Sequence, residues 1–457
     1  MAPNSIVLER DMVLEDTVGT AVAQRVVPEL REEDLHPTLL SHLNERGQPD
    51  TFAAPDLDRL GYRIEVYVLD YSNTLTGTHK GLKAKTSLDE CLQRGANIAL
   101  FGNFSSEKRK GTEGSGMDAL EVVAAHYDSM QVIGFVPSDS PTVNIDEVEY
   151  GKAGKRKKIR IGIDCNEYLS GKRLEEIFRN CILGEAVPGD SLSEFYQSQE
   201  AASIAPALLE MGIDPHGKSL AVTNLAELPQ ENEALRFEPV HKAYGYDTEL
   251  REELCQMDVI ISTVGSAERF LGQLGSFAPT FDEYGGRTAP IHIFVTTPGN
   301  PLGDSPIPTS NEGVNRLDTP YDNPCHAEVM RYAIEEGYMV RYMVAGDDEK
   351  TTGSGIASML RENVFPDLEV STTGALAFSA LSKRNCTRDS YGQRLSQKDK
   401  EALDQSGIMF NNLNAQYLQD DGQIGSMMKQ IILPDPGSRK LKICIVNTGS
   451  STNPYLS

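Results

Sequence analysis

The stretch VYVLDYSNTLT (residues 66–76) decides how the rest of the chain is interpreted. Residues 66–69 are apolar and partly β-branched, which is typical of a buried strand. Asp70 ends this run, and small polar residues follow it. Open α/β sheets bind ligands at the carboxyl ends of their strands, and an aspartate there can attack a phosphoryl group. We therefore expect Asp70 to lie at a site; the alternative is an ordinary strand followed by an Asn/Ser/Thr turn.

A second strand is predicted soon after the first. Apolar residues at helical spacing occupy 82–92, Gly95 follows as a helix stop, and 97–101 form a new apolar run. Strand, helix and strand in this order predict a βαβ unit whose two strands are parallel neighbours. Such a unit would bring the polar residues at 102–106 beside Asp70.

Composition and charge exclude several classes of protein. The 457 residues are enough for two or three domains and have the composition of an ordinary soluble globular protein. The formal net charge of −24 argues against nucleic acid or an anionic membrane as the main partner. Seven cysteines, odd in number and without CxxC pairs, indicate a reduced compartment. Because the chain has no apolar run of transmembrane length and an acidic N-terminal region, we expect a cytoplasmic protein.

Two regions differ in composition from their surroundings. Residues 1–60 mix charge and proline, and we interpret them as an N-terminal extension with a short amphipathic helix over 30–43. Residues 112–160 are loosely composed, with Gly and Pro clusters, and end in a basic run at 152–160. We interpret this run as a solvated linker, with a nuclear-import or polyanion-binding patch as the alternative.

The stretch from 160 to about 290 is interpreted as a second α/β module. Helices are predicted over 171–182 and 193–211, and apolar strands over 159–163 and 259–262. The module lies between the two parts of the chain that carry the polar strand ends.

Two adjacent carboxylates follow a later strand. Strands are predicted over 289–297 and 338–344, and the second runs into GDDEKTTGSG (residues 346–355). Asp347 and Asp348 are costly to place together unless a cation or solvent relieves their repulsion. They are therefore candidate metal ligands.

The last part of the chain is predicted to contain little regular structure. Residues 368–370 resemble the last core strand of the haloacid dehalogenase-like family, and this resemblance implies a short strand there. Residues 380–457 are polar and contain one predicted strand, over 441–446.

These motifs, in this order, resemble those of the haloacid dehalogenase-like (HAD) superfamily, in its NagD-like branch. The resemblance implies an α/β fold, with a Rossmann-like parallel-sheet HAD core and an inserted α/β cap domain. It implies a phosphohydrolase that acts on a small phosphorylated substrate through an aspartyl-phosphate, with Mg²⁺ as cofactor. The implied domains are an N-terminal extension over 1–60, a core over 61–115 and 289–380, a cap over 116–288 and a C-terminal extension over 381–457. The implied site residues are Asp70 and Ser72 for catalysis, Asn103, Ser105, Ser106 and Thr319 for phosphate, and Asp70, Asp347 and Asp348 for the metal.

The chain departs from the family at several chemical positions. Ser72 stands in place of the general acid/base, Thr319 in place of a lysine, and Thr351 or Thr352 in place of a later metal carboxylate. General acid/base catalysis is typically worth about 10²–10⁴-fold in rate. A catalytically impaired HAD-like binding or structural protein is therefore one alternative. A Rossmann-type enzyme is another, because residues 345–350 also resemble a motif of inositol-phosphate synthases.

The expected partner under the first interpretation is a small phosphorylated molecule. Neither nucleic acid nor a membrane is expected as a partner, since the chain is strongly acidic and lacks a membrane span. Assembly into a homo-oligomer is left open.

Overall fold

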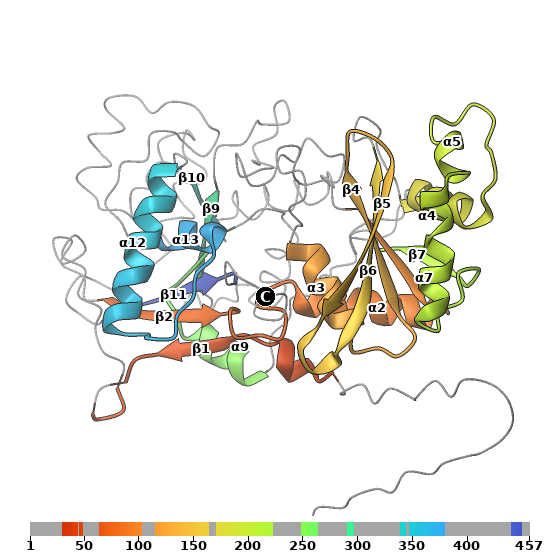
Figure 1. Ribbon diagram of the computed structural model, residues 1–457. Helices are drawn as coiled ribbons and strands as arrows, with labels where there is room; N and C mark the ends of the chain where they lie inside the picture. Colours follow the sequence, from red (N-terminus) through yellow and green to blue (C-terminus); the bar gives the residue numbers. More distant parts are fainter. Residues whose placement is uncertain are drawn as a thin grey trace, which may run out of the picture.

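The computed structural model describes residues 30–43, 45–48, 64–102, 115–163, 171–222, 248–263, 290–296, 339–343, 347–379 and 440–449. Within these ranges the chain is an α/β protein, as predicted, and its strands form two separate sheets (Figure 1). No helix in the same ranges is long and apolar enough to cross a membrane.

The first sheet contains six of the described strands, in the order β1-β2-β11-β8-β9-β10. Only β1 is antiparallel to its neighbour. The strands are β1 (Thr38–Ser41), β2 (Ile64–Asp70), β8 (Val259–Thr263), β9 (Ile291–Thr296), β10 (Met339–Met343) and β11 (Leu441–Asn447).

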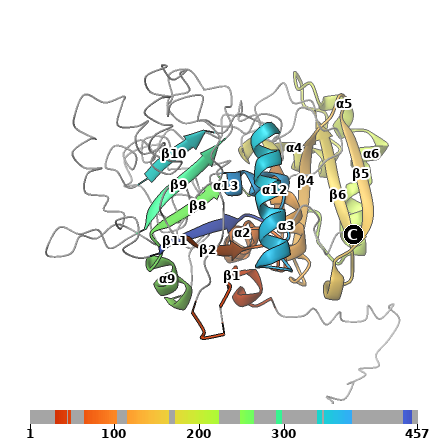
Figure 2. The ribbon, with the colours of Figure 1, turned by 90° about the vertical axis from the view of Figure 1, so that its left-hand side faces the viewer.

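The apolar run over 66–69 lies in strand β2, and all seven residues of this strand are buried. It pairs in parallel with β11, in a register that sets Asp70 beside Asn447. On one face of the sheet, side chains of β2 and β11 pack against α9 (Thr248–Cys255), while α13 (Thr372–Ser379) contacts β8 and β11 (Figure 2). A strand covered on both faces reads as a continuous apolar run, which explains its sequence. The helix α12 (Asp347–Asn363) packs against α13.

The second sheet has the order β5-β6-β4-β3-β7. Its strands are β3 (Ile98–Gly102), β4 (Gln131–Pro137), β5 (Thr142–Glu149), β6 (Lys155–Ile163) and β7 (Ser219–Ala221). The helices that cover it are α2 (Gly81–Gln93), α3 (Ser115–Ala124), α4 (Gly171–Leu183), α5 (Ser193–Tyr196), α6 (Gln199–Ala202) and α7 (Ile204–Glu210). The described residues also form two single turns of 3-10 helix, η1 (Glu32–Leu35) and η2 (Gly151–Ala153).

Two apolar clusters lie on opposite faces of this second sheet. Ala99 and Val132 belong to the cluster formed with α2, α3 and Leu35 of η1, on the side turned toward the six-stranded sheet (Figure 1). The next residues along the strands, Leu100 and Ile133, belong to the cluster formed with α4 to α7. Alternate residues of a strand point to opposite faces, so the sheet is buried on both sides.

The prediction that the strand ending at Asp70 and the next strand are neighbours in one sheet is wrong. β2 lies in the six-stranded sheet and β3 in the five-stranded sheet. The helix between them, α2, was predicted correctly, and Gly95 follows it with a φ of +75°. The apolar face of α2 packs on β3 and β4. A strand–helix–strand order fixes the elements, but it does not fix which strand the helix covers.

The prediction of a solvated linker over the basic run 152–160 is also wrong. The loosely composed region before it forms α3, β4 and β5 from residue 115 onward, and residues 155–160 belong to β6. The basic run lies largely in β6, where Arg156 and Arg160 are buried. The Arg156 guanidinium donates to the backbone carbonyls of Ala124 and Met130, so it binds the carboxyl end of α3, where a cation is favourable.

Three shorter segments differ from their predicted form. Residues 30–43 form the single turn η1 and strand β1 in place of one helix. The helix predicted over 193–211 is three short helices, because Ser198 caps a new helix by accepting a hydrogen bond from Ala201 N. No strand forms at 368–370, which leads into α13. The helix over 171–182 and the strands over 259–262, 289–297, 338–344 and 441–446 are confirmed as α4, β8, β9, β10 and β11.

The boundaries proposed for the core, the cap and the two extensions stay a prediction. They fall at or beside stretches outside the described residues. The strand β11, which was assigned to the C-terminal extension, is a central strand of the six-stranded sheet.

Candidate functional site

The carboxyl ends of β2 and β11 are joined by a hydrogen-bonded cluster around Asp70. Oδ1 of Asp70 accepts from Ser72 N at 2.9 Å and from the Asn447 side chain at 2.8 Å. Oδ2 accepts from Ser72 Oγ at 2.8 Å and from the Asn73 side chain at 2.9 Å. A carboxylate offers about four lone-pair positions in all, so these four donors occupy the capacity of Asp70.

The environment of Asp70 has two opposing effects on its acidity. The residue is fully buried, and this burial raises the pKa of its carboxyl group. The hydrogen bonds from Ser72 and Asn447 act in the other direction but do not cancel the rise. A buried carboxylate with its lone pairs occupied holds two strand ends together and presents no oxygen to a ligand in this arrangement.

The loop after β2 is held against the end of β11. His79 donates its backbone N–H to the Thr448 carbonyl at 3.0 Å, and Thr78 forms a bridge with Gly449. Gly449 has a φ of +146°, and a β-carbon there would lie 2.4 Å from the Gly77 carbonyl oxygen. Only glycine allows this close approach.

Lys80 lies at the end of this loop and is the N-cap residue of α2. Its side chain reaches the first turn of α3, because a β-carbon at Gly116 would lie 3.7 Å from both Cδ and Nζ of Lys80. The residue is partly buried. The lysine therefore lies where the strand end of the six-stranded sheet meets the helices of the five-stranded sheet.

Two helix N-termini meet at this lysine. Each carries a partial positive charge, which favours anions and disfavours cations. The first turn of α2 nonetheless has no acidic residue and carries Lys83 beside Lys80 at the cap, while α3 has Asp118 in its first turn. A phosphate or another anion bound beside Lys80 would be stabilised by the lysine and by both helix ends.

The other residues predicted for the site are placed only in part. Asp347 and Asp348 begin α12, and nothing is described of their side chains. The remaining predicted residues, Asn103, Ser105, Ser106 and Thr319, lie outside the described residues. Among those that are described, no group of three or more His, Cys, Asp or Glu side chains could hold a metal ion.

Sequence reasoning missed Lys80, Gly116 and Asn447. Lys80 carried a usable signal, since a lysine at the start of a predicted helix with no acidic residue in its first turn conflicts with the helix dipole. Gly116 and Asn447 had none, because their roles depend on contacts with residues far away in the sequence.

The comparisons with known proteins do not assign a family. No protein-family model matches the chain, and no curated protein matches it. Among solved structures, the chain is similar to a hydrogen sulfide-producing enzyme (Fn1220) from Fusobacterium nucleatum, at 11% identity and a TM-score of 0.42, over 92% of this chain and 96% of that one. It is similar to maize serine racemase, at 11% identity and a TM-score of 0.39, over 89% and 88%. It is also similar to diaminopropionate ammonia lyase from Escherichia coli, at 10% identity and a TM-score of 0.40, over 88% and 84%.

The resemblance to HAD phosphohydrolases is wrong. β2 and β3 lie in separate sheets, which removes the shared sheet edge on which that interpretation depended. The carboxylate of Asp70, its expected nucleophile, is occupied by four hydrogen-bond donors. The Mg²⁺-dependent phosphohydrolase, the impaired HAD-like scaffold and the inositol-phosphate-synthase-like enzyme are therefore not carried further.

Proposed function

We propose that this chain is an enzyme that holds an aldehyde-bearing, phosphorylated cofactor of the pyridoxal phosphate type on the amine of Lys80. One observation carries the proposal: the Lys80 amine lies against the first turn of α3 while its backbone begins α2. A lysine amine condenses with an aldehyde, and a helix N-terminus is a ready site for phosphate. A cofactor with both groups uses both features.

The residues around Lys80 fit such a cofactor. Gly116 has no side chain, so a phosphate can approach the backbone of the first turn of α3. The sequence that leads into this helix, GTEGSG (residues 111–116), is rich in glycine. The contacts of His79 and Thr78 with Thr448 and Gly449 fix the backbone just before the lysine.

These positions suggest separate roles for the cofactor, for Lys80 and for the first turn of α3. When bound, pyridoxal phosphate supplies an electron sink for reactions of amino-acid substrates. Lys80 would hold the aldehyde carbon, and the first turn of α3 would receive the phosphate.

The proposal is tested by trapping the cofactor on the protein. The purified full-length chain is incubated with pyridoxal phosphate, reduced with borohydride and digested, and the modified lysine is located by mass spectrometry. We expect one dominant modified position, Lys80. The matched variants are Lys80→Ala, which should lose the modification, and Lys83→Ala in the same helical turn, which should keep it.

Modification spread evenly over many lysines would overturn the proposal. Equal modification of the Lys80→Ala variant and the wild type would overturn it as well. Circular dichroism of each variant before labelling shows that the loss comes from the amine and not from unfolding.

A further inference from the structure

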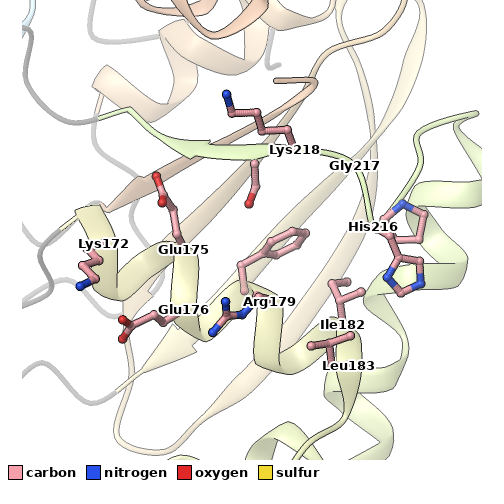
Figure 3. Close-up of a pocket in the computed structure, with 12 residues that line it drawn as sticks. Lys172, Glu175, Glu176, Arg179, Ile182, Leu183, His216, Gly217 and Lys218 are labelled. Carbon is pink, nitrogen blue, oxygen red and sulfur yellow. The ribbon is translucent and has the colours of Figure 1, made fainter. Parts of the chain in front are cut away.

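A pocket lies between α4 and the segment that leads into β7. Its volume is about 510 Å³, within the range of sites that bind small molecules. One wall is a single face of α4, with Lys172, Glu175, Arg179 and Ile182 at helical spacing, and the other includes Pro215 and His216 (Figure 3).

This pocket is separate from the region around Lys80. Phe178, which lines the pocket, belongs to the apolar cluster formed by α4 to α7 on one face of the five-stranded sheet. The helices α2 and α3 cover the opposite face. A ligand in the pocket would therefore occupy a second site, and the inference does not depend on the proposed function.

The pocket combines an apolar floor with a basic rim. Phe178 is buried below it, and Leu183, which is 46% exposed, leaves apolar surface uncovered at its edge. Neither the Arg179 guanidinium nor the His216 ring has a hydrogen bond or ion pair with another residue in the described part of the chain. Lys172 adds a further exposed cation at the same wall.

The other charged groups of the pocket are Glu175, Glu176 and Lys218, and each has a partner in the described part of the chain. The Glu176 carboxylate lies 3.9 Å from the Arg173 guanidinium. Glu175 Oε1 accepts the Ala221 backbone N–H at 2.9 Å. The Lys218 ammonium donates to the Arg94 carbonyl at 2.8 Å. The lining has three cationic side chains, Lys172, Arg179 and Lys218, against two carboxylates, so its formal charge is +1 without His216, on a chain whose net charge is −24. This contrast favours an anionic ligand.

The edge of the sheet beside the pocket favours a small molecule over an added peptide strand. β7 has only three residues. The Ala221 N–H, which an added strand would need, is already bonded to Glu175. A strand docked there would have to displace that carboxylate.

The geometry points to a second binding site for a small organic anion with an apolar body. Its apolar part would lie against Phe178, Ile182 and Leu183, and its acid group would face Arg179 and His216. The chemistry of the site selects a carboxylate or another acid group joined to a ring or a branched chain, because both parts of the pocket are then used.

Binding of matched probes to the full-length chain tests this inference. The probes are 3-phenylpropionate, its neutral amide, and inorganic phosphate. Calorimetry and ligand-observed NMR measure the binding of each probe. We expect saturable binding of the acid, at least about fivefold weaker binding of the amide, and weaker binding of phosphate, which lacks an apolar body.

Two variants localise the site. Arg179→Ala should weaken binding of the acid about five- to tenfold. Arg251→Ala, on the exposed surface of α9, should leave it unchanged. The inference is overturned if none of the probes binds saturably, if the amide binds as well as the acid, or if the two variants behave alike. Displacement of the probe by an acidic peptide but not by small acids would also overturn it in favour of a peptide site.

Discussion

The side-chain amide of Asn447 donates a hydrogen bond to Asp70 Oδ1 at 2.8 Å, across 377 positions of sequence. The same amide also donates to the Glu369 carbonyl, just before α13. Asn447 therefore ties together the ends of two parallel strands and the segment that precedes a helix. Neither Asp70 nor Asn447 has exposed surface, so water cannot replace a lost hydrogen-bond partner.

Replacement of Asn447 by alanine should destabilise the protein by about 2–4 kcal/mol, because a buried carboxylate and a carbonyl each lose a donor. Urea unfolding measures the change. The matched control is Asn363→Ala at the exposed end of α12, where the amide donates to Met359 O at 2.7 Å, and the expected change is within about 0.5 kcal/mol. Equal effects of the two variants would contradict the role given to Asn447.

Two glycine-to-alanine variants should change stability in opposite directions. Gly449→Ala places a β-carbon 2.4 Å from the Gly77 oxygen at a φ of +146°, so we expect a loss of at least about 2 kcal/mol. Gly355→Ala lies within α12, with nothing within 4 Å of the new carbon, and should stabilise the protein by about 0.5–1 kcal/mol. Thermal unfolding of both variants checks the signs. A stabilised Gly449→Ala protein would show that the loop is not held as described.

Glu121 balances two cations beneath α3. Its carboxylate forms an ion pair with Arg160, lies 3.7 Å from Lys158 Nζ and accepts from Tyr150 OH at 3.2 Å, and the Glu121 side chain is 2% exposed. Glu121→Gln leaves the buried Arg160 without its anion, and we expect a loss of about 3–5 kcal/mol in urea unfolding. The exposed pair Glu147–Lys155 provides the control: Glu147→Gln should have no measurable effect. A similar small effect in both variants would refute the prediction.

Asp190 should make part of the stability depend on acid pH. Arg173 donates to both of its carboxylate oxygens, at 2.8 and 2.9 Å, and this interaction holds the pKa of Asp190 below its ordinary value. A depressed pKa in the folded state contributes stability above the unfolded pKa of about 3.9, and this contribution is lost as the pH falls through the folded value.

Asp190→Asn should therefore be less stable than the wild type at pH 7, and the difference should shrink as the pH is lowered through and below about 4. Urea unfolding at a series of pH values measures this convergence. A difference that stays constant with pH would mean that the carboxylate is not the group responsible.

The sequence by itself determined many of the elements. Local apolar periodicity and stop signals predict the buried strand that ends at Asp70, helix α2 with Gly95 after it, helix α4 and the strands β8 to β11. The α/β class follows from their alternation. These features are local because each depends on residues within one or two turns or one strand.

Only the tertiary structure decided how the elements are combined. Helix α2 could have covered β2 or begun a second sheet, and it packs on β3 and β4 because the apolar surface of α3 and Leu35 completes a cluster there. The sequence alone suggested that Arg156 and Arg160 are solvated, whereas in the structure both are buried. The sequence alone suggested that Asp70 is a reactive carboxylate. In the structure, Asn447 from the far end of the chain donates one of the four hydrogen bonds that occupy this carboxylate. The placement of Lys80 against Gly116 likewise depends on the contact between two helices. Packing and hydrogen bonding between distant segments determine these roles. The local sequence around a residue does not specify which distant segment will contact it in the folded chain.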